Sequence, residues 1–144
     1  MGVLIDWISQ PPTPCDLLLV AMPGVGDVGK LAIDAVNAEL DAEPIARILH
    51  PALPPLAKLD EDGLLAPPHI LLSRVIVDGR EVYTLTGDAQ PMTPEGQHEL
   101  AVSVLELCEG GEVLVLAGMS AQAERKEVFT ITSSSSYRIE LESM

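Results

Sequence analysis

The residues best suited to chemistry stand in one run at 22–31, MPGVGDVGKL, between an apolar segment at 17–21 and a helical pattern. Gly24, Gly29 and Lys30 match the phosphate-binding pattern G-x-x-x-x-G-K-[ST], in which glycine backbone and lysine cradle a phosphate. Leu31 stands where that pattern requires a magnesium-binding hydroxyl. Asp27 adds negative charge inside the loop, so the run does not predict a P-loop nucleotidase.

The same glycines also fit the dinucleotide fingerprint G-x-G-x-x-G through Gly24, Gly26 and Gly29. That fingerprint needs an acidic residue about 20 positions on to bind the ribose. Asp41 and Glu43 fall near this distance, but they precede the next predicted strand rather than end it. Two interpretations remain. One is a tight turn with close helix–strand packing, whose helix N-terminus still favours some anion; the other is a binding role unrelated to nucleotides.

A second polar group also follows a predicted strand and precedes a helix, in the segment Gly87-Asp88-Ala89-Gln90-Pro91. Open α/β sheets place their ligands beyond the strand ends. We therefore expect Asp88 to line one crevice together with the glycine-rich loop. The alternative is that Asp88 and Gln90 satisfy backbone groups of their own loop.

A third candidate segment is His50-Pro51-Ala52-Leu53-Pro54-Pro55. Pro51, Pro54 and Pro55 fix φ and remove backbone donors, which predicts a rigid extended connection. It is either a simple connector or one wall of a ligand- or partner-binding surface. The chain has no G-x-S-x-G elbow and no catalytic Cys–His or paired-carboxylate pattern, so we assign no catalytic residues.

Apolar spacing predicts the elements that must hold these loops. Helical intervals run through 28–40, and Thr93, Pro94 and Glu95 start a second helix that Gly110-Gly111 ends. Asp78-Gly79 predicts a hairpin turn. Predicted strands cover residues 3–8, 17–22, 45–49, 70–77, 81–86, 113–117 (as a buried strand) and 128–131, with an acidic turn at 60–63 and a polar or edge-strand tail at 138–144. This order predicts an α/β fold with a mixed, mostly parallel sheet.

Length and composition limit the classes of function that the chain could have. The 144 residues fit a single α/β domain at 1–132 and a Ser-rich, acidic C-terminal tail at 133–144. The net charge of −14 argues against binding nucleic acid or an anionic membrane. With no long apolar segment and no basic leader, we expect a cytoplasmic protein. Cys15 and Cys108 lack metal spacing, so we expect reduced, buried or half-buried thiols, no metal and no cofactor.

Five blocks in order carry a family resemblance. They are the glycine-rich run with its preceding strand, the segment 50–55, the acidic turn at 60–63, the segment 87–91 with Pro94-Glu95-Gly96-Gln97, and Leu116-Ala117-Gly118. Together they span about residues 17–132 and resemble the proteasome assembly chaperone family of the second-subunit type, in its archaeal form.

The resemblance implies a three-layer α/β/α sandwich of the phosphorylase/hydrolase-like kind. It implies a non-enzymatic assembly or protein-interaction factor, a homo-oligomer, with proteasome α-subunits as a candidate partner. The partner surface would form where the glycine-rich loop, the segment 50–55 and the segment 87–91 converge at one edge of the sheet. The alternative is a small-molecule protein or enzyme on this fold that binds a nucleoside or phosphate, with Lys30 and Asp88 as its polar groups.

The chain also departs from the family pattern. Its later strands and helices are missing, so we expect another copy or a partner to cover the shortened sheet. Tyr137 lies seven residues from the end, unlike the hydrophobic-Tyr-any terminus of chaperones that dock into α-ring pockets. Asp27 stands where the family commonly has Asn, which disfavours an anion further.

Overall fold

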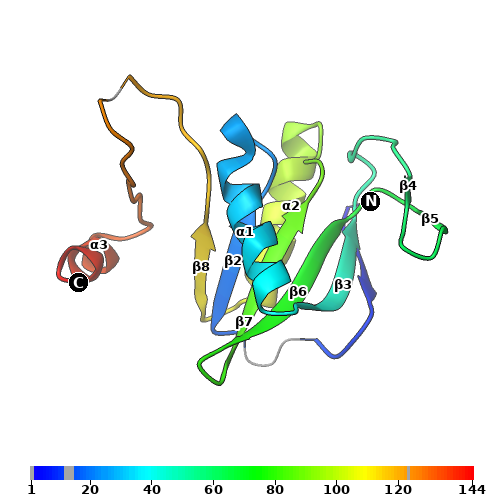
Figure 1. Cartoon of the computed structure of the whole chain (residues 1–144), viewed down its shortest axis with the longest axis horizontal. Helices are drawn as coiled ribbons and strands as arrows, with labels where there is room; N and C mark the ends of the chain where they lie inside the picture. Colours follow the sequence, from blue (N-terminus) through cyan, green and yellow to red (C-terminus); the bar gives the residue numbers. More distant parts are fainter. Residues whose placement is uncertain (1, 12–14, 123) are drawn as a thin grey trace.

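A computed structural model describes residues 2–11, 15–122 and 124–144 (Figure 1). Its central layer is a six-stranded sheet in the order β1-β3-β6-β7-β2-β8. Helix α1 (Val28–Glu39) covers one face and α2 (Pro94–Leu107) the other, while α3 (Ser135–Glu142) stands apart (Figure 1). The strands are β1 (Leu4–Trp7), β2 (Leu17–Ala21), β3 (Glu43–Leu49), β4 (Lys58–Leu59), β5 (Leu65–Ala66), β6 (Ile70–Val77), β7 (Arg80–Gly87) and β8 (Glu112–Val115). The predicted α/β sandwich is confirmed.

The sheet is mixed, and its parallel part is confined to one side. Strand β2 pairs in parallel with β7 and β8. The pairs β1–β3, β3–β6 and β6–β7 are antiparallel. The antiparallel share is larger than expected because the β6–β7 hairpin lies inside the sheet and β1 and β3 continue its pattern. Parallel strands end at the same edge of a sheet. The segments that follow β2, β7 and β8 therefore leave from one edge.

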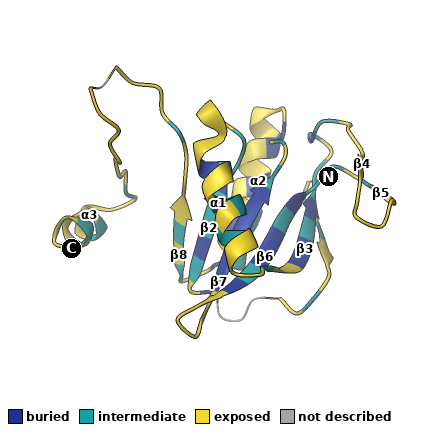
Figure 2. Ribbon diagram, viewed as in Figure 1, coloured by how far each residue is buried: buried dark blue, intermediate teal, exposed yellow. Residues whose placement is uncertain are grey.

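Strand alternation divides the interior into two packed layers. Leu18 of β2 and Leu85 of β7 are buried on the face that α2 covers with Leu100 and Val104. On the other face, Ile33 of α1 is fully buried. Most buried residues of the sheet lie along its central strands (Figure 2). Polar contacts are few in both layers, so apolar burial supplies most of the stability.

Local signals produce the predicted turns and caps. Thr93 Oγ1 accepts the Gly96 N–H at 3.0 Å and caps α2. Asp78 and Gly79 adopt positive φ values of 50° and 77° in the β6–β7 turn. A further hydrogen bond holds α1 on the sheet, since Thr84 Oγ1 donates to Asn37 Oδ1 at 2.7 Å.

Four expectations about irregular segments were wrong. Residues 50–55 form a turn and not an extended connection, because the Leu53 N–H donates to His50 O at 3.0 Å and Leu53 enters the core. Strand β8 lies at the sheet edge with Val115 exposed, so it is not a buried strand. Residues 128–131 form no strand, and Val128 and Ile131 are exposed. The edge-strand alternative for the tail is also wrong, because residues 135–142 form the exposed helix α3, whose N-cap Ser134 Oγ accepts the Tyr137 N–H.

Candidate functional site

Three loops lie side by side at the carboxyl edge of the parallel strands. They are the Gly loop (residues 22–27), the His50 loop (50–55) and, between them, the Asp88 loop (87–91). Gln90 Nε2 donates to Pro23 O at 2.6 Å, which joins the Asp88 loop to the Gly loop. The Met92 N–H donates to Ala52 O at 2.7 Å, which joins its other side to the His50 loop. Backbone and amide hydrogen bonds therefore assemble all three segments into one surface.

The Gly loop forms hydrogen bonds within itself. It contains a short 3₁₀ turn, η1 (Val25–Asp27), with Gly26 at φ 62° and Asp27 at φ 50°. Asp27 Oδ1 accepts the Gly24 N–H at 3.3 Å. The Asp27 carboxylate therefore accepts the hydrogen bond that the Gly24 N–H would otherwise donate to a bound anion, so the loop does not suit a phosphate.

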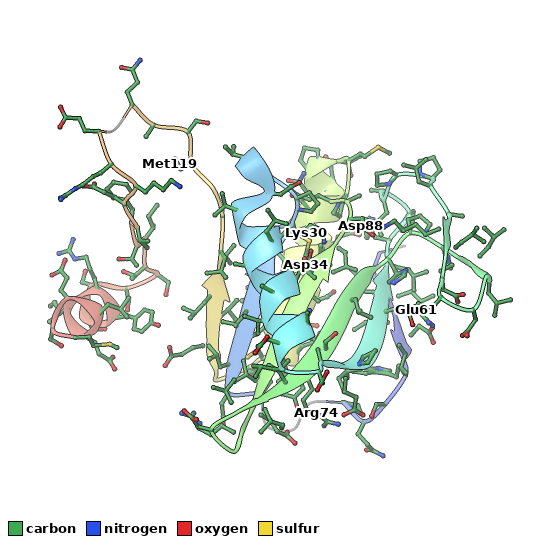
Figure 3. All side chains as sticks on the ribbon, in the orientation of Figure 1. Lys30, Asp34, Glu61, Arg74, Asp88 and Met119 are labelled. Carbon is green, nitrogen blue, oxygen red and sulfur yellow. The ribbon has the colours of Figure 1, made fainter. Side chains whose placement is uncertain are left out.

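Lys30 and Asp88 lie within one cluster of charges (Figure 3). Lys30 Nζ lies 2.7 Å from Asp34 Oδ2 and 3.8 Å from Asp88 Oδ1, and Lys58 also binds Asp88. The hydrogen bond from Lys58 is the main cause of a lowered pKa at Asp88; burial acts in the opposite direction, and the nearby charges of Lys58 and Lys30 add to the lowering. Lys30 is directed at these carboxylates, so its charge is neutralised within the surface.

His50 is fixed in one tautomer by its neighbours. Its Nδ1 accepts the Ala52 N–H at 2.9 Å, so Nε2 carries the proton and donates to Glu99 Oε2 at 2.6 Å. This hydrogen bond is the main cause of a lowered pKa at Glu99. The side chain of His50 is only 7% exposed. It therefore anchors the His50 loop to α2 and is poorly placed for contact with a ligand.

The proline and glycine positions differ in exposure. Pro51 and Pro55 are exposed and Pro54 is half-buried, so the prolines do form part of the outer surface. Pro91 is buried and Gly87 is half-buried, which places them beneath it. The exposed residues alone are available to a partner.

Gly29 permits the closest approach in the site. A Cβ at this position would lie 2.1 Å from Leu116 O and 3.1 Å from Ala21 Cβ. Helix α1 therefore packs directly on the backbone that follows β8. This is the close helix–strand packing that the sequence left open as one interpretation of the glycines.

An apolar hollow of about 240 Å³ opens beside the Gly loop. Val20, Met22, Val115 and Leu116 contribute to its lining, and Gln90 supplies a polar side chain. Val25 and Val28 also line it and are 52% and 58% exposed. Leu31 and Met92 add further exposed apolar surface at 61% and 64%. The surface thus pairs its charges internally and presents aliphatic side chains outward.

Sequence reasoning missed several residues of this surface. The Lys30–Asp34 pair follows the i, i+4 rule and was open to prediction. Val25 was assigned no role from the sequence, and Val28 was assigned only to the apolar spacing of the helix at 28–40. Lys58 and Glu99 come from elements distant in the sequence, and no local pattern indicates their contacts with Asp88 and His50.

Neither a metal-binding cluster nor a membrane-spanning helix is present among the described residues. Within 2–11, 15–122 and 124–144, His, Cys, Asp and Glu side chains form no group of three or more that is placed to hold a metal ion. None of the helices described has the length and apolar character needed to cross a membrane.

Comparisons with known proteins give one family match and two solved structures of similar fold. The PAC2 family matches residues 18–144. The crystal structure of Pyrococcus furiosus PbaB, an archaeal proteasome activator, superposes with a TM-score of 0.74 at 22% identity, covering 88% of this chain and 55% of PbaB. That of Pyrococcus furiosus PbaA, an archaeal homolog of proteasome-assembly chaperone, gives 0.73 at 23% identity, covering 99% and 58%. The chain thus spans little more than half the length of either protein. No curated protein sequence matches it.

The packing at Gly29 yields a stability prediction. Gly29→Ala should lower the free energy of unfolding by about 1–3 kcal/mol, because α1 must move off the backbone of Leu116. Gly24→Ala is the matched control: its Cβ would meet only Met22 O at 3.9 Å, so we expect a change within about 0.5 kcal/mol. Urea denaturation followed by circular dichroism measures both. Equal stability of the two variants would contradict the packing role of Gly29.

Proposed function

The chain belongs to the PAC2 family, and on this premise we propose that it is a non-enzymatic assembly factor that binds a protein partner through the three-loop surface. The observation that carries the proposal is that the polar groups of this surface are paired within the chain, whereas its apolar side chains are exposed. Asp27, Lys30 and His50 are all engaged within the chain, whereas Val25 and Val28 are exposed. Catalysis requires polar groups free to meet a substrate, whereas protein association uses exposed apolar side chains inside a polar rim.

The candidate partner is a proteasome α-subunit. PbaA is described as a homolog of proteasome-assembly chaperone and PbaB as a proteasome activator, and both share this fold. Apolar contact near the Gly loop would supply affinity, and the net charge of −14 would favour a partner with a basic surface.

Mixing the protein with the proteasome α-subunit of its own source, at equal concentration, should give a species heavier than either alone by light scattering. Val28→Asp should weaken this complex at least about tenfold, because it places a charge in the apolar contact. Leu105→Asp is the control, since Leu105 is 57% exposed near the other end of α2, away from the loops. Absence of a heavier species, or equal loss in both variants, would reject the proposal for this partner.

We also propose that the protein is a homo-oligomer joined at the β8 edge. Within the part of the chain that the structure describes, β8 has β2 as its only partner, and Val115 is 69% exposed. An open apolar edge is a template for pairing with another chain. A second copy would cover it and would extend the sheet across the interface.

Light scattering of the protein alone at high micromolar concentration should therefore give a dimer or a larger species. Val115→Lys should shift the mass toward the monomer, since a lysine on an edge strand opposes pairing. Leu105→Lys, on α2, should leave the mass unchanged. A monomeric unsubstituted protein would refute this interface.

A small-ligand role is the second candidate, and the hollow beside the Gly loop is the observation that favours it. Its volume of about 240 Å³ is below that of typical ligand sites, ~300–1,000 Å³, and Asp27 disfavours an anion. We expect nucleosides and phosphate at millimolar concentration to leave the thermal midpoint unchanged. A saturable rise that Ala117→Trp abolishes by filling the hollow would support the ligand role instead.

A further inference from the structure

The two cysteines of this chain meet in the core although 93 positions separate them. Cys15 Sγ lies 2.9 Å from Cys108 Sγ. Both residues are free thiols, and they are 7% and 3% exposed. Cys15 lies just before β2, and Cys108 is the C-cap of α2. The contact therefore joins the start of β2 to the end of α2.

The backbone around the thiols holds them in place. Cys108 Sγ also lies 2.9 Å from Cys15 O, to which its S–H donates. Gly111 packs directly against the pair: a Cβ there would lie 2.2 Å from Cys15 O and 2.9 Å from Cys108 Sγ. A disulfide bond is about 2.05 Å long, so a movement of under about 1 Å would bring the sulfurs to bonding distance.

We propose that Cys15 and Cys108 are a redox-linked pair that forms an intrachain disulfide by exchange with a low-molecular-weight disulfide. One cysteine loses its proton and attacks the reagent, which forms a mixed disulfide and releases one reagent thiol. The second cysteine then attacks the protein sulfur of that mixed disulfide and releases the other reagent thiol. Two cysteine sulfurs are oxidised, two reagent sulfurs are reduced, and the two cysteine protons end on the released thiols.

Burial sets the conditions for this exchange. Desolvation, reinforced by the Cys108 contact, raises the pKa of Cys15 to about 12, so little thiolate forms in the closed structure. The reagent reaches the pair during local opening, and reclosing brings the sulfurs together. The bond would tie the start of β2 to the end of α2. The other ends of these elements carry the Gly loop and the Asp88 loop, so their spacing would become covalently restrained.

The experiment is a titration of the folded protein with oxidised and reduced glutathione, followed by acid quench, alkylation in denaturant and intact-mass measurement. Because the chain has two cysteines, a monomeric product that lacks two hydrogens and resists alkylation identifies this disulfide. We expect such a product, a raised urea midpoint, and an effective thiol concentration at least about 100-fold higher in native buffer than in strong urea.

Cys108→Ser is the control. It retains a hydroxyl donor toward Cys15 O but leaves a single thiol, so glutathione should give no rise in its urea midpoint. Should this variant not fold, the comparison of native and urea titrations on the unsubstituted chain still decides the question. Persistence of two alkylatable thiols, a lasting glutathione adduct, disulfide-linked dimers, or equal effective concentrations in buffer and urea would each overturn the proposal.

Discussion

The structure depends on the position of β2 between two parallel neighbours. Leu18 and Ala21 are fully buried, and β2 pairs with β7 on one side and β8 on the other. This pairing brings the ends of three strands to one edge, and the chain must leave that edge through tight turns. The Gly loop, the packing of Gly29 on Leu116 and the apolar hollow all follow from this constraint. A one-residue slip of β2 would turn Leu18 from the face covered by α2 to the face covered by α1, and its packing with Leu100 and Val104 would be lost.

Regular elements with their own local signals were predictable from the sequence. The Thr93 cap, the Asp78-Gly79 turn and the aliphatic runs at 17–21 and 70–77 each specify conformation through neighbouring residues, and all of them have their predicted conformations here. Order along the chain also gave the α/β class and the family. Strand direction was harder to foresee, because the hairpin signal does not show that β6 will lie beside β3 within the main sheet.

The candidate site was predictable only in outline. The three loops could be chosen because each follows or precedes a strand, and the structure sets them side by side. Their internal pairing could not be foreseen, since Glu99 reaches His50 and Lys58 reaches Asp88 across many residues of chain. The failed strand at 128–131 shows the same limit: β-propensity in Val128 and Ile131 needs a neighbouring edge, and propensity alone does not supply it.

The position of β1 decides what intrinsic fluorescence can observe in this molecule. Trp7 is the only tryptophan of the chain, it lies on β1 at one extreme of the sheet, and it is 39% exposed. Strand β8 and the Gly loop lie toward the opposite extreme, beyond β3, β6 and β7. Tryptophan emission is therefore sensitive to separation of β1 from β3. It should not respond to binding at β8, at the opposite edge of the sheet. On mixing with a partner that lacks tryptophan, an emission change would place the contact at the β1 side of the sheet.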